Sequence, residues 1–168
     1  MEYLIVVERR LGQAAKWLAH AGGLLVLLDA IWITVSVFRR YVLNDPDPVV
    51  TEAAALLLLP LAFAGLAYAF AEDANPKVTL ILEKLPVKFS DTIEKINILI
   101  TVGIGALLTA FAGGAALRSY MSGAASPVIE WPEYFLWIAV CLFSAVFTLL
   151  AVVRLIRRVI ARYPDNQE

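Results

Sequence analysis

The sequence predicts an all-α membrane protein with four transmembrane helices in a single domain over residues 1–168. Of its 168 residues, 61% are hydrophobic and 17% are charged, against about 45–50% and about 25% in soluble domains. Four apolar runs have 21 or 22 residues each, and a helix needs about 20 to cross a bilayer core of about 30 Å. The runs cover residues 18–38, 51–71, 96–117 and 132–153.

Two further segments have apolar residues at helical spacing and are predicted to lie along the membrane surface. The first covers residues 1–17 and would turn into the bilayer at Trp17. The second covers residues 77–95, where an apolar stripe runs beside four lysines. For this second segment, the alternative is an ordinary connector whose stripe packs on its own bundle. Residues 154–168 are expected to form a tail after the last span.

The distribution of basic residues predicts the orientation. Eleven of the 14 Lys and Arg residues lie before the first span, between the second and third, or after the fourth. The positive-inside rule therefore places these segments, and both termini, in the cytoplasm. Aromatic residues that prefer the headgroup level lie at the opposite ends of the spans: Tyr41, Tyr120, Trp131, Tyr134 and Trp137.

Composition excludes several kinds of chemistry. The chain has one cysteine, Cys141, and one histidine, His20, which is too few for a thiol redox pair, a bis-histidine haem or an imidazole–thiolate metal site. Net charge is −1 and the basic residues form no single run, so nucleic-acid binding is not supported. We expect no catalytic, cofactor or metal site, and no enzymatic activity.

Asp29 is an acidic residue near the middle of the first span, where a carboxylate costs roughly 2.5–3.5 kcal/mol to insert. It should point at another helix, and Pro60, Cys141 and Ser144 are predicted at similar depth. Two interpretations follow: a proton or cation coupling site, or a hydrogen-bonded interface residue. The absence of a second intramembrane acid or base favours the interface residue.

The third span carries two rows of small residues at four-residue spacing, a pattern that lets helix backbones approach closely. One row holds Gly105, Thr109 and Gly113, and the other holds Ala106, Ala110 and Gly114. The close neighbour is either within this chain or in another protein.

The short loop after the first span collects charged side chains at the outer face. Arg39, Arg40, Tyr41 and Glu52 are candidates for docking a partner, because arginine forks readily onto carboxylates. The alternative is that these groups pair among themselves, with Asp45 and Asp47 nearby.

Several motifs in order resemble the small membrane subunit (DctQ-like) of tripartite ATP-independent periplasmic (TRAP) transporters. They are the run Arg40-Tyr41-Val42-Leu43-Asn44, the acidic Glu52, the segment Leu61 to Ala67, the segment Lys77 to Pro86, and Trp131-Pro132. The resemblance implies a bacterial inner-membrane protein that scaffolds a large multi-helix transport subunit. It implies that this partner works with a periplasmic solute-binding protein in sodium-driven uptake of an organic acid or related solute.

The same resemblance implies structural or docking roles for Arg40 and Tyr41, and makes Glu52 a candidate partner for one of the arginines. Two other functions are weighed against it. One is a self-sufficient homodimeric transporter coupled through Asp29. The other is a small membrane enzyme, whose expected cytoplasmic cluster of His, Arg and Tyr is missing.

Overall fold

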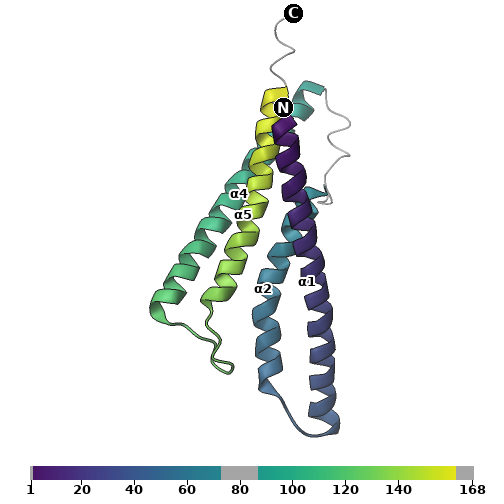
Figure 1. Cartoon of the computed structure of the whole chain (residues 1–168), viewed down its shortest axis with the longest axis vertical. Coiled ribbons are helices and arrows are strands. Elements are labelled where there is room, and N and C mark those ends of the chain that lie inside the picture. The colour runs from purple at the N-terminus through teal and green to yellow at the C-terminus, as the bar shows by residue number, and fades with distance from the viewer. Residues whose placement is uncertain (1, 73–86, 162–168) are drawn as a thin grey trace, which may run out of the picture.

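The computed structural model describes residues 2–72 and 87–161 as four helices joined by loops (Figure 1). They are α1 (Glu2–Val42), α2 (Pro48–Ala71), α4 (Val87–Ser122) and α5 (Tyr134–Ala161). Each is long and apolar enough to cross a membrane. The four predicted spans are therefore confirmed by length and composition.

The helices extend further than the predicted spans at several ends. Helix α1 continues through Trp17 without a break, so the predicted turn there is wrong. No proline occurs between residues 2 and 42, and nothing else in that stretch removes a backbone donor. Residues 87–95 run directly into the third span as part of α4, while the rest of the predicted segment 77–95 lies outside the described residues.

The fourth span also differs at both ends. Helix α5 begins at Tyr134 rather than Pro132, because Pro132 forms an antiparallel bridge with Ala125. At its other end α5 reaches Ala161, so residues 154–161 of the predicted tail are helical. No proline or glycine occurs within residues 134–161.

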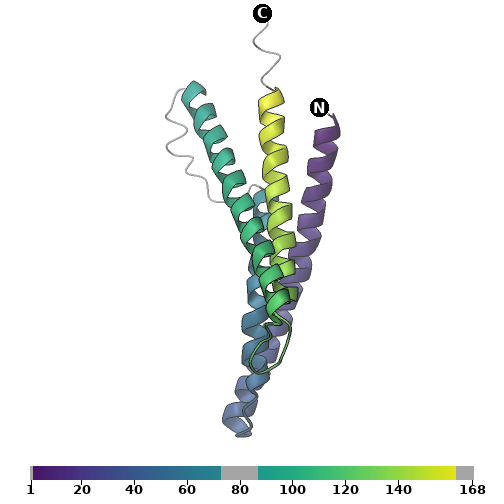
Figure 2. The same cartoon turned by 90° about the vertical axis from the view of Figure 1, so that its left-hand side faces the viewer.

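The helices form two antiparallel hairpins, α1 with α2 and α4 with α5 (Figure 1). The connections at residues 43–47 and 123–133 lie at the same end, which we call the loop face. The opposite end, the terminal face, holds the start of α1 and the end of α5. Toward it α1, α4 and α5 spread apart (Figure 2).

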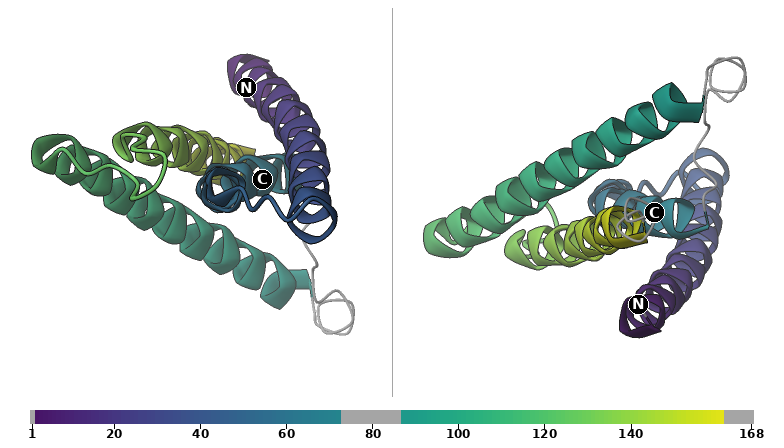
Figure 3. Two further views of the ribbon diagram at one scale, coloured as in Figure 1. Left: turned by 90° about the horizontal axis from the view of Figure 1, so that it is seen from below. Right: turned by 90° about the horizontal axis from the view of Figure 1, so that it is seen from above.

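Helix α5 contacts each of the other three helices, and most extensively α4. Viewed along the bundle, α2 and α5 lie between the outer helices α1 and α4 (Figure 3). The buried cluster consists of Ala15, Ala67, Phe147 and Leu150. Most of the other buried apolar residues that the structure describes are alanines, which allow close approach of helices in a membrane.

Much of the apolar surface remains uncovered by the chain itself. In the most apolar 18-residue window of α1, 6% of the residues are buried, against 28% in α5. Side chains such as Leu24, Ile31 and Phe38 are more than half exposed. This surface requires an apolar environment outside the chain.

Candidate docking and packing sites

The connection between α1 and α2 is held by Arg39. Asn44 follows the last turn of α1 with φ of 53°, a left-handed conformation that asparagine tolerates better than most residues. The chain then reverses, and the Asp45 N–H donates to the Arg39 carbonyl over 3.2 Å. The Arg39 guanidinium donates to the carboxylate of Asp45 and lies 3.8 Å from that of Asp47.

Asp47 in turn caps α2, since its Oδ1 accepts the Val49 N–H over 3.1 Å. Arg39 therefore connects the end of α1 to the start of α2 through internal ion pairs. Of the two predicted roles for this residue, internal pairing is the one the geometry shows.

Arg40 and Tyr41 point outward beside this connection. The Arg40 guanidinium lies 5.8 Å from the centroid of the Tyr41 ring, within the range of a cation–π contact. Tyr41 is 77% exposed, and Arg40 is exposed too. These two predicted docking residues therefore remain available to a partner at the loop face.

Glu52 binds the other hairpin. One carboxylate oxygen accepts the N–H of Val128 over 2.9 Å and that of Ile129 over 3.1 Å. These are charge-assisted bonds to backbone donors, which are stronger than neutral ones. In the described part of the chain, Glu52 therefore binds the backbone of the α4–α5 loop rather than an arginine.

That loop, residues 123–133, is held by hydrogen bonds within itself. The Ser126 N–H donates to the Trp131 carbonyl over 2.9 Å, and the Trp131 N–H donates to Ser126 Oγ over 3.2 Å. Ser126 is buried while Val128 and Trp131 stay partly exposed. The loop thus presents apolar side chains at the loop face from a fixed backbone.

The two rows of small residues on α4 have different surroundings. An added Cβ at Gly105 would lie 2.6 Å from Thr148 Oγ1 and 3.1 Å from the Phe147 ring. Hydrogen bonds follow the same row: Thr109 Oγ1 lies 3.2 Å from Thr148 Oγ1, and Cys141 Sγ donates to the Thr109 carbonyl over 3.6 Å. The row of Gly105, Thr109 and Gly113 therefore packs on α5.

The second row does not pack within the chain in the same way. Ala106 and Ala110 are exposed and Gly114 is half-buried. The Cβ that Gly114 lacks would meet Arg118 of the same helix at 3.2 Å. This row is the part of the small-residue pattern that faces outward.

Asp29 lies on the side of α1 that faces α2. Gly22 packs against Leu61 and Ala64, and Asp29 is two turns further along the same face. Its Oδ1 is buried and has no hydrogen-bond partner among the described residues. Of the predicted neighbours, Ser144 donates to the carbonyls of Val140 and Cys141, and the Cys141 thiol donates to the carbonyl of Thr109. The Ser144 hydroxyl and the Cys141 thiol are therefore not directed at Asp29.

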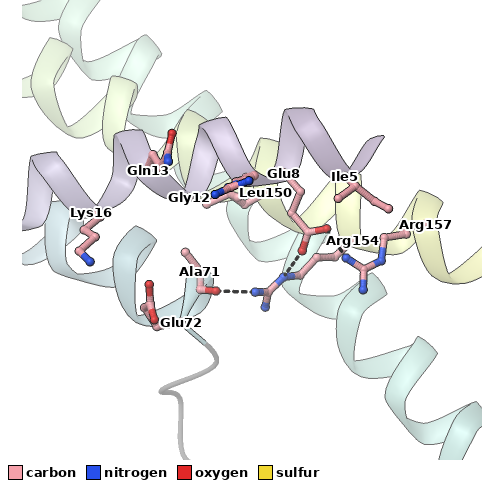
Figure 4. Close-up of a pocket in the computed structure, with 11 residues that line it drawn as sticks. Ile5, Glu8, Gly12, Gln13, Lys16, Ala71, Glu72, Leu150, Arg154 and Arg157 are labelled. Carbon is pink, nitrogen blue, oxygen red and sulfur yellow. Dashed lines mark hydrogen bonds and ion pairs between the residues drawn. The ribbon is translucent and has the colours of Figure 1, made fainter. Parts of the chain in front are cut away.

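The terminal face holds a charged cluster that joins three helices (Figure 4). The two Glu8 oxygens accept from Arg154 Nε over 3.2 Å and from Arg157 over 2.6 Å. Arg154 also donates to the Ala71 carbonyl at the end of α2 over 2.7 Å and lies 4.7 Å from the Phe70 ring centroid. Arg154 therefore ties α5 to both α1 and α2.

A groove of about 390 Å³ opens beside this cluster, and we call it the basic groove. Its charged lining consists of four cations and two carboxylates: Arg9, Lys16, Arg154, Arg157, Glu8 and Glu72. In the described part of the chain, no group of three or more His, Cys, Asp or Glu residues is placed to hold a metal ion.

Comparison with protein families identifies the chain. The family described as tripartite ATP-independent periplasmic transporters, DctQ component, matches residues 29–161. That range covers 133 of the 168 residues. The chain belongs to the DctQ family. The resemblance noted in the sequence is therefore confirmed, and a search of curated proteins finds no match.

DctQ is a transporter component family and not an enzyme family. It is one component of tripartite transporters, which implies a larger membrane subunit and a periplasmic binding protein. With four membrane-spanning helices, this DctQ protein is a multi-pass protein of the bacterial inner membrane. The family gives no support to a self-sufficient transporter coupled through Asp29.

Two tertiary contacts of this DctQ protein were missed by sequence reasoning. Glu52 binds a loop 76 positions away, and Glu8 binds arginines about 146 positions away. The sequence contains an indication of the Glu8 contact, because Glu8 and Arg154 have opposite charges and lie outside spans that end at the same face of the bundle. For the first, the acceptor is a side chain but the donors are backbone groups, which no residue pattern indicates.

Proposed function

We propose that this chain is the small permease subunit of a sodium-driven TRAP transporter that takes up an organic acid or related solute. In this role it scaffolds and anchors a large transport subunit, which carries the solute. The DctQ family match supports the assignment to a tripartite transporter.

The observation that carries the scaffold role is the uncovered apolar surface of the spans. The helices spread apart toward the terminal face (Figure 2), and the outer helix α1 has the least buried window. In a bilayer, such faces are covered by lipid or by helices of another protein. A chain that leaves so much helix surface open is suited to extend a larger membrane protein.

We propose that the outward row Ala106, Ala110 and Gly114 contributes to contact with the large subunit. Its small side chains let a neighbouring helix approach closely, and the parallel row on α4 already does so with α5. The two rows would then join α4 to helices on two sides.

We propose that the loop face lies in the periplasm and both termini in the cytoplasm. The distribution of 11 basic residues against three supports this orientation. Arg40 and Tyr41 would then be exposed toward the solute-binding protein. Glu52 contributes indirectly, by holding Val128 and the rest of the α4–α5 loop in place.

We infer that residues 2–17 of α1 lie outside the hydrocarbon core at the cytoplasmic interface. A helix of 41 residues is about 60 Å long, twice the thickness of the core. The apolar positions of this segment favour contact with the headgroup region, although it joins the span without the separate turn that the sequence suggested.

The test is a pull-down of the full chain, tagged at its C-terminus and extracted from its native membrane in mild detergent. Mass spectrometry should find a much larger polytopic membrane protein in about equal amount. Recovery of the chain alone, as a monomer or dimer, would contradict the scaffold role. Extraction in two detergents controls for loss of the partner during solubilisation.

A further inference from the structure

The basic groove on the terminal face is not used by any of the packing or docking roles above. It lies where α1, α2 and α5 meet, and its walls come from all three helices (Figure 4). Arg154 ties these helices together through Glu8 and Ala71, so its bonds connect the walls of the groove.

The charge of the groove is positive after its internal pairing. Glu8 is shared by Arg154 and Arg157, so these three residues together keep one positive charge. Arg9 and Lys16 add two more and Glu72 removes one. Arg9 and Lys16 are both exposed, and Arg157 is half-exposed, so their donors can reach a ligand.

The groove lies at the level where lipid headgroups are expected. Its charged residues come from beyond the ends of the predicted spans: before residue 18 on α1, at residue 72 after α2, and at residues 154 and 157 on α5. Trp17 is next to it in sequence and 77% exposed, as is typical of indole side chains at the membrane interface.

We propose that the basic groove binds the phosphate of an anionic phospholipid headgroup, with Arg9 and Lys16 as its principal contacts. Guanidinium and ammonium groups bind phosphate oxygens through charge-assisted hydrogen bonds. Ile5 lines the same groove and is 48% exposed, so an apolar side chain lies beside the phosphate contacts for the start of an acyl chain. This combination favours a lipid over a free phosphate ion.

The test measures lipid retained on the purified full chain by native mass spectrometry. The chain is exchanged into detergent containing phosphatidylglycerol and phosphatidylcholine of identical acyl chains in equal amounts. We expect retention of phosphatidylglycerol to exceed that of phosphatidylcholine severalfold. Arg9→Gln should lower phosphatidylglycerol retention about fivefold, and Arg9→Gln with Lys16→Gln further still.

The matched control is Arg10→Gln. Arg10 is also exposed and also on α1, but it does not line the groove, so its loss should change retention less than twofold. Equal loss in the Arg9→Gln and Arg10→Gln variants would overturn the proposal, since it would show attraction to net charge alone.

A second arm separates lipid from free anion. Inorganic phosphate at 10 mM, about the strength of an ordinary buffer, should leave phosphatidylglycerol bound to the wild-type chain. Displacement of the lipid by inorganic phosphate, or equal retention of phosphatidylcholine, would overturn it. The measurement needs no transport subunit, so its outcome is independent of the proposed scaffold role.

Discussion

Single charged residues near the ends of the spans hold separate segments of this chain together. Arg39 joins α1 to the start of α2, Glu52 joins α2 to the α4–α5 loop, and Arg154 joins α5 to α1 and α2. Each binds at least one backbone group or more than one partner. Substituting any of these residues should therefore disturb the local structure more than the change of one charge alone would.

Replacing Glu52 by alanine should release the α4–α5 loop. The change removes an acceptor of two backbone N–H groups, and for a half-exposed carboxylate we expect a loss of about 1–2 kcal/mol in the free energy of unfolding. Limited proteolysis in detergent should then cut within residues 123–133 faster. Glu52→Gln keeps an oxygen acceptor and is the control, with a smaller effect. Equal protection of the loop in all three proteins would contradict the role given to Glu52.

Reversing the charge of Arg40 should weaken binding of the periplasmic partner. Arg40 and Tyr41 lie side by side and are exposed. A charge at the edge of an interface mainly affects the rate at which the partner associates. In proteoliposomes containing the complete transporter, Arg40→Glu should raise the half-saturating concentration of binding protein about fivefold. Arg10→Glu, an exposed charge reversal on α1 at the terminal face, is the control. An equal shift in that variant would indicate a general charge effect.

At the scale of elements, α4 packs on one side and is open on another. The row that contains Gly105 contacts α5 along its length, while the row that contains Ala110 faces outward. The sequence could predict that both rows permit close packing. It could not predict which one finds its neighbour within the chain, because the rows are chemically alike.

Gly105→Ala should destabilise the isolated chain. The new Cβ would lie 2.6 Å from Thr148 Oγ1, and overpacking of this kind costs about 1–3 kcal/mol. A lower thermal unfolding midpoint in detergent is the expected result. Gly103→Ala is the matched control, since a Cβ there meets nothing within 4 Å. If both variants melt at the wild-type temperature, α4 and α5 do not pack at Gly105 as described.

Ala110→Leu should leave the isolated chain intact but weaken its complex with the large subunit. The side chain is exposed on the outward row, so the isolated chain accommodates a larger residue there. In the complex, the larger residue would obstruct a helix that packs on this row. Co-purification should fall severalfold while the unfolding midpoint of the isolated chain stays unchanged. Phe111→Leu, an exposed apolar change one position along, is the control. Undiminished co-purification of the Ala110→Leu variant would show that this row faces lipid.

For the whole molecule, the number and approximate limits of the spans follow from hydropathy alone, because length and apolar content are local properties. The ends of helices are less predictable. Helix α1 runs through Trp17 and α5 runs past Val153, since a polar or aromatic residue alone does not stop a helix. Of the predicted loop-face residues, Arg40 and Tyr41 remain exposed, and Arg39 pairs with Asp45 and Asp47 close by in the sequence. Glu52 binds a loop that only the folded chain brings near.

Orientation can be tested with single cysteines. In a Cys141→Ser background, Val128→Cys at the loop face should react with a membrane-impermeant maleimide in intact cells whose outer membrane has been made permeable. Gln13→Cys on the first turns of α1, also exposed, should react only after lysis. The reverse pattern would contradict the proposed direction of the four spans.

Two of the contacts that link the hairpins lie at opposite ends of α2. Glu52 near its start holds the second hairpin at the loop face, and the carbonyl of Ala71 in its last turn accepts a hydrogen bond from Arg154 at the terminal face. The groups of the second hairpin that make these bonds, the α4–α5 loop and Arg154, follow the whole first hairpin in the chain. Both bonds therefore belong to the joining of the two hairpins and not to the formation of the first.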